Sequence, residues 1–276
     1  MKREISKQWK VTHTQNSPSQ TQGWVLAPGR WEEFDPFLIM AEDWFQKGTF
    51  GFHPHRGIET VTYVVDGELH HKDNHGGEGI LKKGDVQWMT AGKGILHAEE
   101  PVGDQTVHSL QLWINLPAKN KMTDTRYQDL YQQDMPLMKE QGTSIRIFSG
   151  TYKGKQAPTL NYTPIMMLDM MMEPEAETTI DIPASYNGFL YILEGNGIFG
   201  ERAQKGEKNH VLWLGPGNGT QEENSTLSVK TTSDVLHAIL YAGEPIKERV
   251  VAQGPFVMNT EEEIRQAFLD YRQGKF

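Results

Sequence analysis

Two pairs of side chains in the first half of the chain have the spacing of metal ligands. His53 and His55 stand two residues apart where the chain enters a predicted strand, and His97 and Glu99 repeat that spacing later. Because alternate residues of a strand point to the same side, each pair presents both side chains to one face. If both strands line one barrel interior, three nitrogens and one oxygen surround a single point. That set suits a divalent first-row transition metal.

The amino-acid composition limits the kinds of catalytic and metal-binding site that the chain can form. The chain has no cysteine, which excludes disulfides, thiol nucleophiles, iron–sulfur clusters and zinc fingers. Catalysis would therefore use histidine, carboxylate, hydroxyl or lysine groups, or a metal held by nitrogen and oxygen. His70, His71 and His75 lie in a polar, glycine-rich stretch, and we expect them at the surface.

Length and charge limit the classes of protein. The chain has 276 residues, which favours two medium-sized domains, and a net charge of −9, which argues against direct binding of nucleic acid. The residues from Met1 to Gly23 are polar, and no apolar run approaches the roughly 20 residues of a membrane-spanning helix. We therefore expect a cytoplasmic protein that binds no membrane.

The elements that must position these ligands are predicted to be strands. Short β-branched and aromatic segments, such as 59–65, 86–89 and 107–116, alternate with glycine-containing turns. Short strands separated by turns at this spacing are typical of an all-β barrel or sandwich. A similar rhythm returns after about residue 140, and Glu194-Gly195 repeats Asp66-Gly67 at an offset of 128 residues, which indicates a duplicated domain.

We predict domains at 1–134 and 135–276, with the polar segment from Lys119 to Gln141 as the linker. One helix is expected at 260–273, because Thr260 and Glu263 have capping-box spacing before an apolar stripe. That helix is expected to pack on the sheets. The methionine-rich run 166–172 is expected to be a buried strand.

The second half lacks the ligand pattern. At the 128-residue offset His53 and His55 correspond to Asp181 and Pro183, and Glu59 corresponds to Asn187. His210 and His237 have no partner two residues away, so we expect structural or surface roles for them. The metal is therefore expected in the first domain.

The motifs resemble those of a known family. The segment from Gly51 to Tyr63 resembles the first cupin motif, and the segment from Gly84 to Glu99 resembles the second. In detail both resemble the pirin family, and Gly254 to Glu263 is similar to the C-terminal signature of pirins. The resemblance implies a bicupin, with two tandem antiparallel β-barrel or jelly-roll domains and a C-terminal helix.

The resemblance also bears on the carboxylate ligand. Spacing alone does not choose between Glu99 and Glu59, since Glu59 is four residues after His55 and would share its face in a regular strand. Pirins take the carboxylate two residues after the histidine of the second motif, which implies His53, His55, His97 and Glu99 as ligands. Glu59 is then expected to orient a ligand histidine or a bound water.

Several bacterial pirins resemble quercetinases, which implies a metal-dependent dioxygenase that opens the central ring of a flavonol such as quercetin. The cofactor is expected to be Fe(II), with Mn, Ni, Co, Cu or Zn as alternatives. Glu99 is the expected proton acceptor for the substrate. Four neighbouring apolar residues are candidates for an aromatic slot: Phe52, Trp88, Met89 and Trp113.

Other pirins resemble regulators. The resemblance therefore also allows a metal-responsive protein that binds a transcription factor or a metabolic enzyme without catalysis. A metal-dependent isomerase or hydrolase is a weaker third hypothesis, because no sugar-phosphate site is evident in the sequence.

Overall fold

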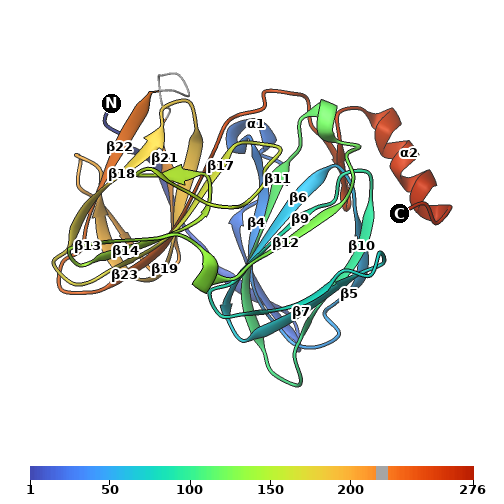
Figure 1. Cartoon of the computed structure of the whole chain (residues 1–276), viewed down its shortest axis with the longest axis horizontal. Coiled ribbons are helices and arrows are strands. Elements are labelled where there is room, and N and C mark those ends of the chain that lie inside the picture. Colours follow the sequence, from blue (N-terminus) through green and yellow to red (C-terminus); the bar gives the residue numbers. More distant parts are fainter. Residues whose placement is uncertain (216–222) are drawn as a thin grey trace. The chain divides into compact units, whose positions relative to one another are not determined.

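The computed structural model describes residues 1–215 and 223–276 and consists mainly of antiparallel strands (Figure 1). The chain divides into two compact units. We call His13–Gln132 with Ile246–Phe276 the N-terminal domain, and Met1–Thr12 with Gln133–Pro245 the C-terminal domain. The all-β expectation is confirmed.

Two sheets form most of the N-terminal domain. The larger sheet has the order β12 (Arg126–Leu130), β9 (Val86–Thr90), β6 (Ile58–Asp66), β11 (Val107–Asn115), β4 (Phe37–Phe45), β3 (Gln20–Leu26) and β2 (His13–Ser17). The smaller sheet has the order β5 (Phe50–His55), β10 (Ile95–Pro101), β7 (Glu68–Asp73) and β8 (Glu78–Lys82). The domain also contains α1 (Trp31–Phe34) and the short helix η1 (Ala118–Asn120).

The described part of the C-terminal domain contains one large sheet. Its main path is β1 (Ile5–Lys10), β21 (His210–Leu214), β19 (Asn187–Phe199), β23 (Leu236–Gly243), β17 (Ile165–Met172), β14 (Thr143–Ser149) and β13 (Leu137–Glu140). Beside this path lie β18 (Glu177–Pro183), β20 (Gln204–Glu207) and β22 (Asn224–Lys230), and a separate hairpin joins β15 (Thr151–Tyr152) to β16 (Lys155–Gln156). The methionine-rich run forms β17 and is mostly buried, as expected.

The expected division at residue 134 assigns both terminal segments of the chain to the wrong domain. Strand β1 pairs with β21, so the first residues fold with the C-terminal domain. The last residues form β24 (Val251–Gln253), β25 (Phe256–Met258) and α2 (Glu261–Arg272) and fold with the N-terminal domain. Val257 N–H donates to the Arg56 carbonyl at 3.1 Å, which fixes this returning segment beside β5. Such long-range pairing leaves no local signal in the sequence.

The expected linker is wrong for most of its length. Its residues include β12 at the edge of one sheet and β13 at the edge of the other, with the short helix η2 (Gln132–Asp134) between them. Edge strands are half-exposed, and both of these contain polar residues. The polar residues of this segment therefore belong to strands at the edges of the sheets and do not mark a linker.

Helix α2 confirms the capping prediction. Thr260 is the N-cap and accepts from Glu263 N–H, while the Glu263 carboxylate accepts from Thr260 N–H at 2.9 Å. Its buried face carries Ile264 and Ala267, which pack with Phe256 of β25. The helix thus anchors the returning segment.

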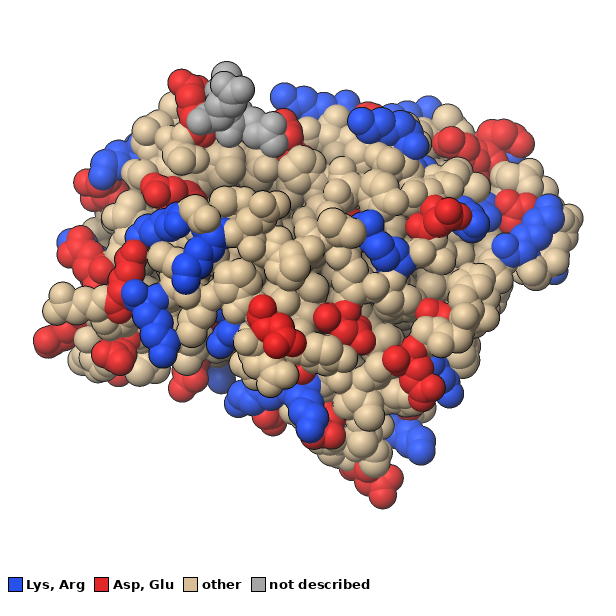
Figure 2. All heavy atoms as spheres, viewed as in Figure 1, with Lys and Arg blue, Asp and Glu red and all other residues tan. Residues whose placement is uncertain are grey.

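Within the described residues, no helix is long and apolar enough to cross a membrane. On the face shown in Figure 2, acidic and basic side chains are interspersed, and the described residues form no continuous basic patch there.

Candidate metal centre

Three histidines converge inside the N-terminal domain. Strands β5 and β10 pair antiparallel, with His97 opposite His53 and Ile95 opposite His55. The ring centroids of the three imidazoles lie 4.4–5.1 Å apart. One nitrogen from each ring lies within 4.8 Å of the other two. The structure therefore brings together the three predicted nitrogen ligands.

The nitrogens of this cluster fit a metal ion. Both ring nitrogens of His55 and of His97 are buried without a hydrogen-bond partner among the described residues. His53 Nδ1 donates to the Gly51 carbonyl at 2.8 Å, which leaves the Nε2 lone pair available. Unpartnered buried polar atoms are costly, and coordination of a cation satisfies them.

Burial also favours the neutral forms of His55 and His97, as metal coordination requires. Burial, with a smaller contribution from the nearby His53, lowers the pKa of His55 to about 3. Burial likewise lowers the pKa of His97 well below its usual value, with smaller contributions from His55 and His53. Neutral rings offer lone pairs at every physiological pH.

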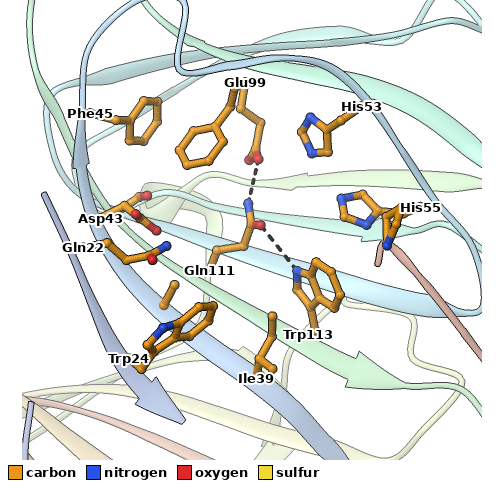
Figure 3. Close-up of a pocket in the computed structure, with 14 residues that line it drawn as sticks. Gln22, Trp24, Ile39, Asp43, Phe45, His53, His55, Glu99, Gln111 and Trp113 are labelled. Atoms are coloured by element: carbon orange, nitrogen blue, oxygen red, sulfur yellow. Dashed lines mark hydrogen bonds between the residues drawn. The ribbon is translucent and has the colours of Figure 1, made fainter. Parts of the chain in front are cut away.

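Glu99 lines the same pocket but is held by protein groups. Its Oε1 accepts from Thr62 Oγ1 at 2.9 Å, and its Oε2 accepts from Gln111 Nε2 at 2.6 Å (Figure 3). Trp113 Nε1 in turn donates to Gln111 Oε1 at 3.4 Å. The close three-nitrogen cluster does not include Glu99.

A pocket of about 260 Å³ opens beside the histidines. Alternate residues of three neighbouring strands line it: Gln22 and Trp24 of β3; Ile39, Ala41, Asp43 and Phe45 of β4; Ser109, Gln111 and Trp113 of β11. The period of two shows that the inner face of the larger sheet forms one wall. His53, His55 and Glu99 form part of the opposite wall.

Only one of the four predicted aromatic-slot residues lines this pocket. Trp113 does so, and its ring meets that of His55 edge-on at 5.0 Å. Phe52 is 51% exposed, because it alternates with His53 and points away from the interior. Trp88 is completely buried in the core.

Met89 is the fourth predicted slot residue, and it is also completely buried, in a hydrophobic cluster with Ile58 and Ala91. Phe50 also lines the pocket and was not predicted to do so, because its inward position depends on a register shift between His97 and Glu99 on β10. Regular alternation would not have placed Phe50 there. The aromatic positions on β3 and β4 follow simple alternation and were open to prediction.

Glu59 is not beside the histidines. It lies three residues before Thr62 on β6, and an odd separation places the two side chains on opposite faces of the strand. Glu59 Oε1 accepts from Thr90 Oγ1 at 2.7 Å. Burial raises the pKa of Glu59 to about 7, although hydrogen bonding to Thr90 and Trp88 opposes this. The expected role in orienting a ligand is not supported.

Among the other histidines, the prediction for His71 is wrong. It is 1% exposed, although we expected it at the surface. It pairs with Glu99 across β7 and β10, its Nε2 lies 3.1 Å from Asp129 Oδ1, and its ring stacks on Tyr127. Its polar neighbours in sequence concealed this inward position. His70, in contrast, is half-exposed and meets Glu78.

The returning C-terminal segment supports the turn between β5 and β6. The buried Arg56 guanidinium forms an ion pair with Asp270 of α2 at 2.9 Å and donates to the Lys93 carbonyl at 2.6 Å. Gly57 has a φ of +80°, and a Cβ there would lie 2.0 Å from the Val257 carbonyl oxygen. Glycine is therefore required beside the histidine pair.

The equivalent strands of the C-terminal domain carry different residues. Strands β18 and β22 pair as β5 and β10 do, with Asp181 opposite Thr226 and Pro183 opposite Asn224. His237 is on β23, where its Nε2 lies 2.7 Å from Asp169 Oδ1. The histidine cluster is thus a feature of one domain among the described residues.

Comparison with known proteins identifies the family. The family described as "Pirin" matches residues 20–114, and the "Pirin C-terminal cupin domain" matches residues 167–276. A "Pirin-like protein" of Solanum lycopersicum is 46% identical over 246 residues, which cover 88% of this chain and 82% of that protein. The chain belongs to the pirin family. Its fold is the pirin bicupin with a short C-terminal helix.

Solved structures agree with this pirin fold. The protein GK1651 of Geobacillus kaustophilus is 51% identical with a TM-score of 0.88, and the match covers 91% of this chain and 99% of that protein. A quercetin 2,3-dioxygenase of Acinetobacter baumannii is 28% identical with a TM-score of 0.88, covering 100% and 99%. The nickel(II) complex of the bacterial pirin YhhW of Escherichia coli, 19% identical, has a TM-score of 0.67 and covers 87% and 98%, which shows the shared fold.

Proposed function

We propose that this pirin is a metal-dependent dioxygenase that opens the central ring of a flavonol such as quercetin. The observation that carries the proposal is a cluster of three imidazoles, two of them without hydrogen-bond partners among the described residues, beside a pocket with aromatic walls that His53 and His55 line. Similarity to a quercetin 2,3-dioxygenase along the whole chain supports it. We propose Fe(II) as the metal, and Mn, Ni, Co, Cu and Zn share the same ligand preferences.

His53, His55 and His97 would hold the metal, and we propose Glu99 as the fourth ligand. A divalent metal at this position would supply Lewis acidity that favours the deprotonated form of a substrate hydroxyl. The flat side chains of Trp24, Phe45, Phe50 and Trp113 would hold a planar substrate and exclude water from it.

We propose Glu99 as the group that takes the substrate proton. Thr62 and Gln111 donate to its two oxygens, which holds the carboxylate toward the pocket (Figure 3). A carboxylate that accepts the flavonol hydroxyl proton acts as a general base. Ring opening then inserts both atoms of dioxygen and releases carbon monoxide.

The test uses protein loaded separately with Fe(II), Mn, Ni, Co and Cu, mixed with quercetin in air. Loss of the flavonol absorbance is expected with at least one metal. His55→Ala should lose both metal and turnover. Glu99→Gln should lose turnover by about 100-fold or more while keeping some metal, as expected for removal of a general base.

The matched control is Glu59→Gln, a buried carboxylate on the opposite face of β6. This variant should turn quercetin over at the wild-type rate. Normal turnover by Glu99→Gln would contradict the role of Glu99. Inactivity with all five metals would contradict the dioxygenase proposal and favour a regulatory pirin that binds a protein partner.

A further inference from the structure

The pocket has a second polar region away from the histidines. Asp43 on β4 pairs in register with Gln22 on β3 and with Ser109 on β11, and all three side chains line the pocket. They form a polar row across three neighbouring strands. In Figure 3, Asp43 and Gln22 lie on the side of the pocket opposite His53 and His55.

Asp43 is a desolvated acceptor. It is 4% exposed, and Gln20 Nε2 donates to its Oδ1 at 2.9 Å. Burial, with smaller contributions from the nearby Glu99 and Glu42, raises the pKa of Asp43 to about 6, although hydrogen bonding by Gln20 and Gln22 opposes this. Burial of a carboxyl group costs free energy, and a ligand whose hydroxyl donates a hydrogen bond to it offsets part of that cost.

Between the two polar regions, one side of the pocket is apolar, and Gln111 and Glu99 also line the pocket there. Trp24, Ile39 and Trp113 line one side of the pocket between Asp43 and the histidines (Figure 3). A ligand that satisfies both polar regions is therefore planar and aromatic along its length, with oxygen groups at both ends. Among the described residues, no lysine or arginine lines the pocket, so an acidic group at the far end would have no cationic partner there.

We propose that Asp43 is a specificity-determining residue that accepts a hydrogen bond from a ring hydroxyl at the end of the substrate remote from His53, His55 and His97. This inference rests on the proposed function and narrows its substrate class. The preferred flavonols carry hydroxyl groups on the pendant ring as well as on the ring that opens.

The experiment compares quercetin with galangin, a flavonol that lacks both pendant-ring hydroxyls. Dissociation constants are measured without oxygen on metal-loaded protein, by quenching of tryptophan fluorescence. The wild type should bind quercetin at least about tenfold more tightly, as expected for a hydrogen bond to a buried carboxylate. Asp43→Leu should abolish this preference, and Asp43→Asn should reduce it several-fold. Glu59→Gln, the matched control, should keep it.

Equal affinities in the wild type, or an unchanged ratio in Asp43→Leu, would overturn the inference. If Asp43→Leu does not fold, the ratio in Asp43→Asn decides, and an unchanged ratio there has the same meaning. The binding arm is independent of turnover. An Asp43-dependent preference without turnover would sustain this inference and contradict the dioxygenase, whereas turnover with an unchanged preference would do the reverse.

Discussion

Replacing His97 with leucine should stabilise the metal-free protein. Both nitrogens of His97 are buried and unpartnered, and each such group costs about 1–3 kcal/mol. Leucine fills a similar volume without polar atoms. We therefore expect His97→Leu to raise the free energy of unfolding of the metal-free protein by about 2 kcal/mol, whereas most substitutions of buried residues lower it.

The same change should remove the response to metal. A ligand that binds only the folded state stabilises it by about 2.7 kcal/mol at a concentration of 100 times Kd. The wild type should gain this amount when Fe(II) or Ni(II) is added, and His97→Leu should gain much less. Urea unfolding of chelator-treated protein, with and without metal, measures both effects.

His71→Leu is the control, because His71 is equally buried and its Nε2 contacts Asp129, so that only its Nδ1 lacks a partner among the described residues. Its replacement leaves that carboxylate without its imidazole, so we expect a loss of about 1–3 kcal/mol with the metal response retained. If His97→Leu is destabilised like His71→Leu and still responds to metal, His97 is neither a metal ligand nor a costly buried group in the metal-free protein.

Three further predictions concern the surroundings of the site. The pKa of Glu59 is raised from 4.5 to about 7, so its stabilising contribution is complete below about pH 4.5 and is lost as pH rises to about 7. Glu59→Gln should therefore gain about 3 kcal/mol relative to wild type between pH 4 and pH 8 in urea unfolding, and a parallel pH dependence would contradict this. Asp270→Asn should cost about 3 kcal/mol by leaving the buried Arg56 without its carboxylate partner, and a loss below about 0.5 kcal/mol in the same assay would show that the pair is unimportant. Thr260→Ala should cost about 1 kcal/mol and increase amide exchange in the first turn of α2, so unchanged exchange there would argue against the capping box.

Local patterns predicted part of the histidine centre, and the pairing of strands that are distant in sequence completes it. The two-residue spacing of His53 and His55 fixes their shared face, and antiparallel pairing of β5 with β10 places His97 opposite His53. The capping box and the methionine-rich strand are equally local. Family resemblance added the bicupin fold, which the sequence pattern alone limited to a barrel or sandwich.

Features that depend on long-range contacts were missed. Phe50 reaches the pocket through a register shift, and His71 is buried because β7 pairs with β10. The return of Asp270 to Arg56 spans 214 residues. Trp88 shows the opposite error, because nearness in sequence to a metal motif does not decide which face of the sheet a side chain occupies.

The release of carbon monoxide is the most direct test of ring opening at the three histidines. Wild-type protein, stripped of metal and reloaded with Fe(II), is mixed with quercetin and oxygen, and carbon monoxide is measured against quercetin consumed. We expect one carbon monoxide per quercetin for the wild type and none above background for His55→Ala. Equal release from both proteins, or loss of quercetin without carbon monoxide, would contradict ring opening at the three histidines.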